Sequence, residues 1–257
     1  MTNIHPTAIV DAKAELRPGV SIGPYSVVQD DVFIGDNTMI DSHVLIHAGA
    51  RLGKRCRIAK GAVVGSDPQD LKYAGQKTTI EIGDDTVIRE FCTLNRGTTF
   101  HYKTVIGSKC LLMAYVHVAH DCIIGDNVIL ANAVNMAGHV TIESFASIGG
   151  MSPIHQFVRI GCHAFVGGGL RVNKDVPPYI LAAGEPIQFA GINRIGLTRR
   201  GFTAETLHEI RGAYKTIYRS NLNTTQALEK IRSESNIIPE VKIILDFIES
   251  SERGIIK

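Results

Sequence analysis

The 257-residue sequence has no tryptophan and only 6% aromatic residues, which excludes a core built around large rings. It also has no apolar run near the roughly 20 residues that a membrane-spanning helix needs, so we predict no transmembrane segment. A regular repeat begins close to the N-terminus, and we expect no signal peptide before it. These absences favour a cytoplasmic protein.

The sequence also has no strong excess of charge of either sign, because it holds 27 basic and 25 acidic residues and its net charge is +2. The sequence has no nucleic-acid-binding motif and no basic patch interleaved with aromatic residues, so we predict no nucleic-acid partner. Nucleophile elbows, Walker loops and dinucleotide fingerprints are absent as well. We therefore predict neither a cofactor nor a metal.

What the sequence does have is a repeat with a period of six. From Ile4 to Val172, every sixth residue is apolar with two exceptions, and nearly all of them are Ile, Leu or Val. A period of six fits neither an α-helix nor a single strand, and it is typical of a solenoid of short parallel strands. Three hexads make one coil with three flat faces, so residues in the same place of successive coils should stack.

The position four after each apolar residue is small or β-branched and should also point inward. Four cysteines occupy this position and a fifth stands apart, and we interpret all five as reduced rather than as metal ligands or disulfide partners: Cys56, Cys92, Cys110, Cys122 and Cys162. The pattern resembles the hexapeptide-repeat family, which implies a left-handed parallel β-helix. The hand rests on this resemblance, because parallel crossovers in general are right-handed.

Two hexad positions are polar, Asp70 and Gln76, and they mark an interruption of the repeat. Because Val64 and Ile82 are separated by the length of one coil, we expect one coil's worth of chain, residues 66–79, to protrude as a loop without a change of phase. Such a loop is a frequent place for function, although a tolerated insertion would look the same. A weaker irregularity at residues 95–104 is interpreted as a tolerated bulge.

After Val172 the period is lost, and helical spacing follows. Thr203 is a candidate N-cap for a helix that buries Leu207, Ile210, Tyr214 and Ile217. A second helix is predicted over 225–233, and a third begins at Pro239 and ends before Gly254. We therefore predict a β-helix domain over 1–186 and a small α-helical domain over 187–257.

The second part carries uneven charge. The segment 190–219 holds six basic side chains against two acidic ones, a local net charge of +4: Arg194, Arg199, Arg200, Arg211, Lys215 and Arg219 against Glu205 and Glu209. The surface can be a solvated helix face or a docking site for an acidic partner.

Histidines gather in the last coils. The coil length stacks His120, Gly138 and Gln156 in one column, two positions after an apolar residue, where side chains should point outward; His117, His139 and His155 lie nearby. We interpret His120 as a general base for a hydroxyl, Asp121 as its orienting partner, and the Gly138 N–H as an oxyanion donor. Surface coincidence is one alternative. A zinc site of the γ-class carbonic anhydrase kind is another, although its spacing differs.

Several segments resemble the UDP-N-acetylglucosamine O-acyltransferase family over essentially the whole chain: IHPTA at Ile4, QDLKYAG at Gln69, HVAHDC at His117, AGHV at Ala137, HQF at His155, DVPPY at Asp175 and RRGF at Arg199. The resemblance implies a homotrimer with active sites between subunits. It also implies transfer of a 3-hydroxyacyl chain from acyl carrier protein to the sugar 3-hydroxyl of UDP-N-acetylglucosamine, the first step of lipid A biosynthesis, without a metal.

The resemblance assigns further residues. Gln69, Asp70 and Lys72 would reach the sugar nucleotide of a neighbouring subunit, and His117, His139, His155 and Gln156 would line the substrate. Asn193 and Arg199 would hold the nucleotide. Arg199, Arg200, Arg211 and Lys215 would form the carrier-protein surface, and Gly168 would leave the acyl groove open to a long chain.

Three other classes of function remain as alternatives, and the first is another hexapeptide transferase. A related N-acyltransferase should carry an extra N-terminal domain, and an acetyl-CoA enzyme would not need carrier-binding helices. A zinc hydratase would bind metal. A structural solenoid would display regular Thr arrays and has no reason for QDLKYAG or for the histidines.

Overall fold

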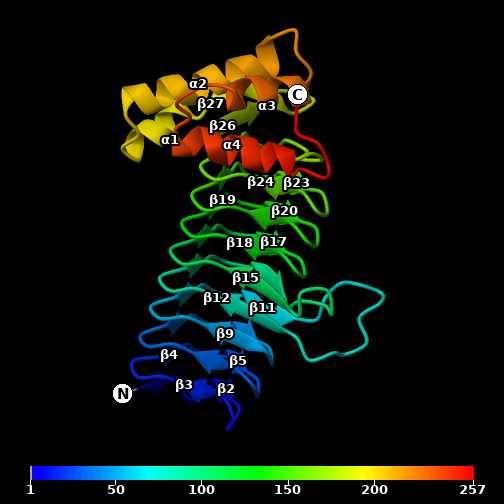
Figure 1. Cartoon of the computed structure of the whole chain (residues 1–257). Helices are drawn as coiled ribbons and strands as arrows, with labels where there is room; N and C mark the ends of the chain where they lie inside the picture. The colour runs from blue at the N-terminus through cyan, green and yellow to red at the C-terminus, as the bar shows by residue number, and fades with distance from the viewer. Residues whose placement is uncertain (1) are drawn as a thin grey trace.

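The computed structural model describes residues 2–257 as a left-handed parallel β-helix that ends in a group of helices (Figure 1). Most strands are very short, and each coil contributes one strand to each of three sheets. Within the described chain all strand pairs are parallel except the last, in which β26 (Ile180–Ala183) and β27 (Gln188–Ile192) are antiparallel. The fold class predicted from the repeat is confirmed.

The three sheets follow the three faces of the prism. The first sheet contains β1 (Asn3–Ile4), β4 (Ser21–Ile22), β7 (Met39–Ile40), β10 (Arg57–Ile58), β13 (Val87–Ile88), β16 (Leu111–Leu112), β19 (Ile129–Leu130), β22 (Ser147–Ile148), β25 (Phe165–Val166), β26 and β27. The second contains β2 (Ile9–Val10), β5 (Val27–Val28), β8 (Leu45–Ile46), β11 (Val63–Ser66), β14 (Thr93–Asn95), β17 (His117–Val118), β20 (Asn135–Met136) and β23 (Pro153–Ile154). The third contains β3 (Glu15–Leu16), β6 (Phe33–Ile34), β9 (Ala50–Leu52), β12 (Thr79–Ile82), β15 (Lys103–Ile106), β18 (Ile123–Ile124), β21 (Thr141–Ile142) and β24 (Arg159–Ile160).

The core is the column of apolar hexad residues inside the prism. From Ile22 to Val172 these side chains are almost fully buried, and the four cysteines of the small inward position are buried among them as free thiols. Burial of each Ile, Leu or Val stabilises the fold by roughly 1.5–3 kcal/mol before the cost of ordering the chain. Phe100 is the exception. It occupies a hexad position but is 62% exposed, because its segment leaves the prism as a bulge.

Strand register shows how much chain each loop adds. In a regular coil a residue pairs with its equivalent three hexads later, as Ile22 does with Ile40. Across the first loop, between β11 and β12, Leu52 pairs with Ile82, which lies five hexads later. The loop therefore adds two hexads, not the full coil that we expected, and it stands out from the prism in Figure 1. Across the second, between β14 and β15, Ile82 pairs with Ile106, so one hexad is added.

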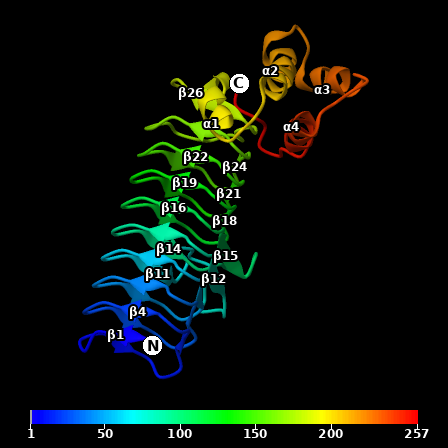
Figure 2. The same ribbon diagram turned by 90° about the vertical axis from the view of Figure 1, so that its left-hand side faces the viewer.

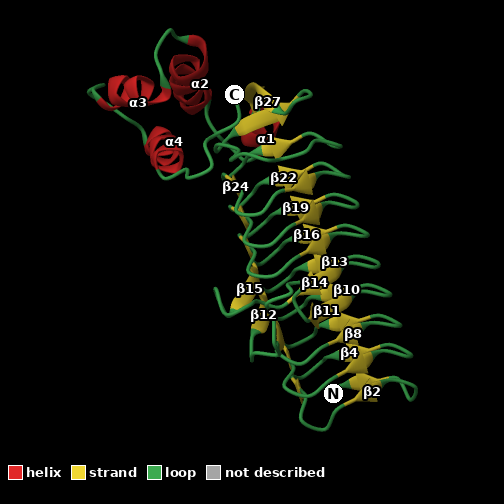
Figure 3. Cartoon of the chain, turned by 90° about the vertical axis from the view of Figure 1, so that its right-hand side faces the viewer, coloured by secondary structure: helices red, strands yellow, loops and turns green. Residues whose placement is uncertain are grey.

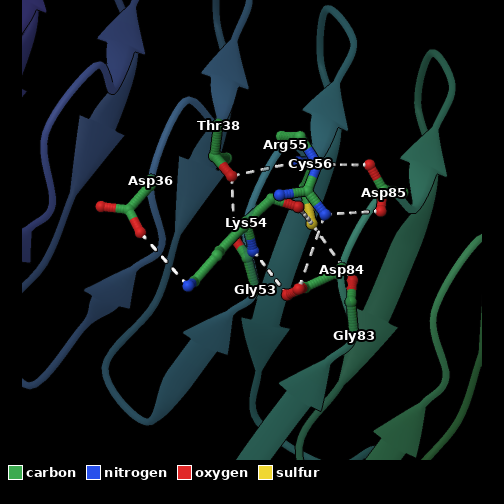
Figure 4. Close-up of polar contacts among 9 residues, drawn as sticks. All are labelled: Asp36, Thr38, Gly53, Lys54, Arg55, Cys56, Gly83, Asp84 and Asp85. Carbon is green, nitrogen blue, oxygen red and sulfur yellow. Dashed lines mark hydrogen bonds and ion pairs between the residues drawn. The ribbon is translucent and has the colours of Figure 1, made fainter.

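Side chains join successive coils at the corner between the third and first sheets (Figure 4). Thr38 Oγ1 accepts a hydrogen bond from the Cys56 N–H of the next coil at 3.0 Å, and the Arg55 guanidinium donates to both carboxylate oxygens of Asp85 at 2.7 Å. Most corners also place one residue in the left-handed region. The φ angle is +55° at Arg55 and +58° at Asp121, which lies in the corner between the second and third sheets.

The helices are α1 (Arg194–Arg199), α2 (Ala204–Arg219), α3 (Thr224–Arg232) and α4 (Pro239–Glu249). The three predicted helices are present, with Thr203 as the N-cap of α2 and Pro239 in the first turn of α4. Both α1 and β27 were missed. No helix of the described chain combines the length and the apolar character that a membrane span requires.

Figures 2 and 3 show α2, α3 and α4 beside the upper end of the prism, whereas α1 and β27 lie over its last coils. Tyr214 on α2 is completely buried and donates its hydroxyl hydrogen to the Pro178 carbonyl at 2.5 Å. The Arg159 guanidinium on β24 lies 4.5 Å from the centre of the Phe247 ring on α4. The helices are thus fixed to the last coils, next to the histidine cluster.

Candidate active site

His120 and Asp121 lie side by side in the corner between β17 and β18. His120 Nδ1 is 2.8 Å from Asp121 Oδ2. Because an ionised carboxylate only accepts hydrogen bonds, Nδ1 carries the proton and Nε2 keeps a lone pair. The two residues form a hydrogen-bonded pair with one basic nitrogen free.

The Asp121 carboxylate is buried among donors. Thr98 donates its hydroxyl hydrogen at 2.6 Å and its N–H at 3.1 Å, and the His101 N–H donates at 3.1 Å. Burial alone would raise the pKa of Asp121, but the hydrogen bonds from Thr98, His120 and the His101 backbone outweigh it and hold the pKa below its ordinary value. Asp121 is therefore ionised at neutral pH and oriented from several sides.

These donors come from the second bulge, residues 96–102, which the sequence suggested was a tolerated irregularity. The bulge closes over Asp121, which is 1% exposed, and His120 beside it is only 6% exposed. His120 points away from the prism core, as its place in the repeat predicts, but it is not openly exposed. Its ring lies outside the prism core but is covered by neighbouring coils and by the bulge.

Gly138 lies directly above His120 in the next coil. A Cβ atom at this position would lie 2.6 Å from Cε1 and 2.8 Å from Nε2 of His120, so any side chain would overlap the imidazole. The backbone N–H of Gly138 donates no hydrogen bond to any residue in the range 2–257. Gly138 and His120 thus stack as the coil length predicts. One N–H without a hydrogen-bond partner in the described chain lies beside the His120 ring.

Aromatic rings form one wall of the site. His139 stacks on Phe157 with ring centres 4.4 Å apart, and it meets the His120 ring edge-on at 5.0 Å. Phe100 from the bulge contacts the His139 ring edge-on at 4.6 Å. Burial lowers the pKa of His139, and this effect outweighs the opposing negative charge of Asp121. His139 is therefore neutral at pH 7 and shields the pair from water.

By distance alone, His120, Asp121 and His139 could hold a metal ion, since one ligand atom of each lies within 4.8 Å of the others. The donor set fits this poorly. The Asp121 oxygens already accept hydrogen bonds from Thr98, His101 and His120. The geometry is that of an oriented acid–base pair.

The other histidines of the cluster lie around this pair. His117, on the outer face of β17, is 2.8 Å through Nδ1 from Thr93 Oγ1, and burial lowers its pKa. His155 and Gln156 are exposed in the coil above Gly138. The four histidines and Gln156 share one corner, with only His120 and His139 in ring contact.

The first loop leaves the prism at the same corner, two coils below. Gln69 and Lys72 are exposed at the tip of the loop. Leu71, which lies between Asp70 and Lys72, is fully exposed. The negative charge of Asp70 is close enough to His139 to oppose the lowering of its pKa. The loop residues therefore lie on the side of the chain that carries the His120–Asp121 pair.

A second set of predicted residues lines a cavity of about 1320 Å³ between α1 and the outer face of the first sheet. Asn193, Arg199 and Arg200 border it. The Asn193 side chain donates to the His163 carbonyl at 3.0 Å and accepts from the Gly196 N–H at 3.2 Å, so it caps α1. The Arg200 guanidinium lies 4.3 Å from the centre of the Phe145 ring.

These two groups do not meet within one chain. The first sheet is the face opposite the corner that carries His120, so the cavity with Asn193 and Arg199 lies on the other side of the prism. Gly168 follows β25 of the first sheet and is likewise away from His120, while Arg211 and Lys215 are exposed on α2. A substrate in contact with both groups must lie between two copies of the chain.

Comparisons with known proteins fit this geometry. Residues 175–256 match the family described as Udp N-acetylglucosamine O-acyltransferase, Domain 2, and residues 31–66 and 103–138 match the bacterial transferase hexapeptide repeats. The acyl-[acyl-carrier-protein]–UDP-N-acetylglucosamine O-acyltransferase of Herminiimonas arsenicoxydans is 45% identical over 100% of both chains. The chain belongs to the UDP-N-acetylglucosamine O-acyltransferase family.

Solved structures of this family have the same fold. The UDP-N-acetylglucosamine acyltransferase of Bacteroides fragilis is 45% identical, with a TM-score of 0.97 over 98% of this chain and 99% of that one. The UDP-N-acetylglucosamine O-acyltransferase of Moraxella catarrhalis is 41% identical, with a TM-score of 0.95 over 99% of both chains. The protein is therefore an acyltransferase of the UDP-N-acetylglucosamine O-acyltransferase family.

Sequence reasoning missed the part of this acyltransferase that surrounds Asp121. Thr98, His101 and Phe100 all belong to the second bulge, where one hexad is added. One signal was available, because both additions fall at the corner that later carries His120. Two insertions at one corner in successive coils indicate a built surface better than either does alone.

Proposed function

We propose that this acyltransferase moves a 3-hydroxyacyl chain from acyl carrier protein to the 3-hydroxyl of UDP-N-acetylglucosamine, the first step of lipid A biosynthesis. The relatives are named as acyl-[acyl-carrier-protein]–UDP-N-acetylglucosamine O-acyltransferases, which supports the donor and the acceptor. The observation that carries the proposal is the His120–Asp121 pair, 2.8 Å apart, under the free N–H of Gly138. A base with one free nitrogen and a donor beside it are what acyl transfer to a hydroxyl requires.

In the proposed mechanism, His120 Nε2 takes the proton of the sugar hydroxyl as its oxygen attacks the thioester carbonyl. The carbonyl oxygen becomes negative, and the Gly138 N–H donates to it. The intermediate then collapses, the C–S bond breaks, and His120 returns the proton to the leaving thiolate. Asp121, held ionised by Thr98, stabilises the positive imidazolium between these steps and keeps its ring in place.

We further propose a homotrimer with its active sites between subunits. The outer faces of the first and second sheets mix apolar and polar residues, and within residues 2–257 Arg57 is the one charged strand residue among them; apolar positions include Ile9, Val27 and Leu45 on the second sheet and Val87, Leu111, Ile129 and Phe165 on the first. The third sheet carries more charge, with Glu15, Arg51, Glu81 and Arg159 beside Phe33, Val105 and Ile123. Packing the first sheet of one copy on the second sheet of the next closes a ring of three. The cavity with Asn193 and Arg199 can then face the His120 corner of another copy.

In this arrangement Gln69, Asp70, Lys72, His117, His139, His155 and Gln156 contact the sugar nucleotide or the acyl chain, and Gly168 leaves the acyl groove open to a long chain. Arg199, Arg200, Arg211 and Lys215 form the surface that receives the acidic carrier protein. We place the reaction in the cytoplasm.

The test is mass spectrometry of the product made from UDP-N-acetylglucosamine with 3-hydroxyacyl carrier proteins of increasing chain length. We expect one acyl chain on the sugar, lost with His120→Ala, which should lower turnover by about 10² to 10⁴. His43→Ala, an exposed corner histidine far below the site, is the matched control. Absence of product with the wild-type enzyme, or near-normal turnover of His120→Ala, contradicts the proposal.

A further inference from the structure

One partly buried arginine, Arg96, makes several of the contacts that join the first loop to the rest of the chain. The Arg96 side chain, 16% exposed, donates to the Tyr73 hydroxyl at 2.9 and 3.1 Å through Nη2 and Nε, and to the Ala48 carbonyl at 2.9 Å through Nη1. Its Nη2 also lies 2.5 Å from Asp67 Oδ1. One guanidinium thus binds the first residue of the loop, its middle and the coil beneath it.

Few other polar contacts tie the loop down. In the described chain, the other polar side-chain contacts are the Asn95 amide, which donates to the Asp67 carbonyl at 2.9 Å, and Lys77, whose ammonium is 3.8 Å from Asp31. Pro68 adds a buried apolar contact near the start of the loop. Lys77 is largely exposed, so its ion pair is weak. The Tyr73 hydroxyl in turn donates to the Gln76 carbonyl at 2.9 Å. Arg96 therefore also restrains the later part of the loop, through Tyr73.

Arg96 belongs to the same bulge that holds the Asp121 carboxylate. Thr98, two positions later, donates to Asp121, and the Gly97 N–H between them donates to the Thr79 carbonyl at 3.1 Å. A Cβ at Gly97 would overlap the backbone of Lys103, so the bulge packs closely against its own return strand. The bulge is therefore a short, rigid connection between the His120–Asp121 pair and the first loop.

We infer that Arg96 is a positioning residue that holds the 67–78 loop in register with the His120–Asp121 pair, so that Asp70 and Lys72 meet the sugar nucleotide at a fixed place. The inference rests on the proposed function for the role of Asp70 and Lys72. In this proposal Arg96 acts through its contacts with Asp67, Tyr73 and Ala48 and not on the substrate. Arg96 holds the loop of the free enzyme in the conformation that binds the nucleotide. Its loss should therefore raise KM for UDP-N-acetylglucosamine and leave kcat unchanged.

The test compares Arg96→Met with wild type. We expect KM for UDP-N-acetylglucosamine to rise about tenfold or more, with kcat and the KM for the acyl carrier protein little changed. Trypsin cleavage after Lys72 should also become faster, because a released loop enters a protease more easily. Arg55→Met, which breaks a two-bond contact with Asp85 away from the loop, should leave the nucleotide KM and the cleavage unchanged.

Tyr73→Phe provides a second variant that keeps the ring and removes only the hydroxyl. It should raise the same KM in the same direction, and the Arg96→Met/Tyr73→Phe double variant should be no worse than Arg96→Met alone. Wild-type KM and wild-type cleavage in both single variants would overturn the inference, and so would a fall in kcat with KM unchanged. The cleavage assay needs no substrate, so it separates this inference from a failure of the proposed reaction.

Discussion

Gly138→Ala would place a methyl group 2.6 Å from Cε1 and 2.8 Å from Nε2 of His120. Carbon atoms rest at about 3.5–4.0 Å, so the imidazole would have to shift by about 1 Å. A displacement of this size at a reacting group lowers a rate by about 10²-fold, or about 2.7 kcal/mol. Because the N–H at position 138 is kept, the loss would measure the placement of the base and not the loss of the oxyanion donor.

The assay is kcat/KM with a 3-hydroxyacyl carrier protein and UDP-N-acetylglucosamine, normalised to folded protein. Gly107→Ala is the matched control. Its new Cβ would lie 2.5 Å from Asp126 Oδ1 and 2.6 Å from the Gly125 carbonyl carbon, so it strains the coil at least as much, through the backbone and with no histidine among the nearest atoms. It should lower thermal stability and leave kcat/KM nearly unchanged. A Gly138→Ala enzyme within about threefold of wild type would refute the reasoning.

Two further predictions concern charge. Thr98→Val removes a hydrogen bond to the ionised Asp121 carboxylate. The pKa of Asp121 should therefore rise toward its ordinary value. A carboxyl group whose pKa is lower in the folded state than in the unfolded state stabilises the fold at every pH above its unfolded-state pKa. This stabilisation is lost as the pH falls through the folded-state pKa. The acid limbs of thermal stability and kcat/KM should therefore move to higher pH, and unchanged limbs contradict this. Arg200→Glu should raise KM for the carrier protein and weaken its salt dependence; if Arg232→Glu on α3 does the same, the docking surface lies elsewhere.

The fold was largely predictable because its signal is periodic. Apolar residues repeat every six positions, and the two insertions, of two hexads and of one, are whole multiples of that period, so the phase passes through them unchanged. Phe100 shows the limit. An apolar side chain at the right spacing looks the same whether it enters the prism or, as here, packs on His139 in a bulge.

The site was predictable only where the period determines position. His120 and Gly138 are one coil apart and stack as expected, whereas Thr98 and Arg96 act from a bulge whose path depends on hydrogen bonds to Asp121 and Tyr73. No spacing in the sequence encodes those contacts. The role of Asn193 as the N-cap of α1 was missed for a similar reason, because α1 is short and lies against the last coils.

The left-handed corner at Asp121 has a consequence for which residues can serve there. The same conformation recurs one coil above at His139, with φ of +62°, and again at Phe157, also +62°. The active-site corner is therefore an ordinary corner of this solenoid, and the position of the carboxylate needs no local distortion of its own. Aspartate and asparagine tolerate this backbone, while β-branched residues do not. Backbone geometry thus disfavours β-branched residues at position 121, and acid–base chemistry favours the carboxylate among the side chains that remain.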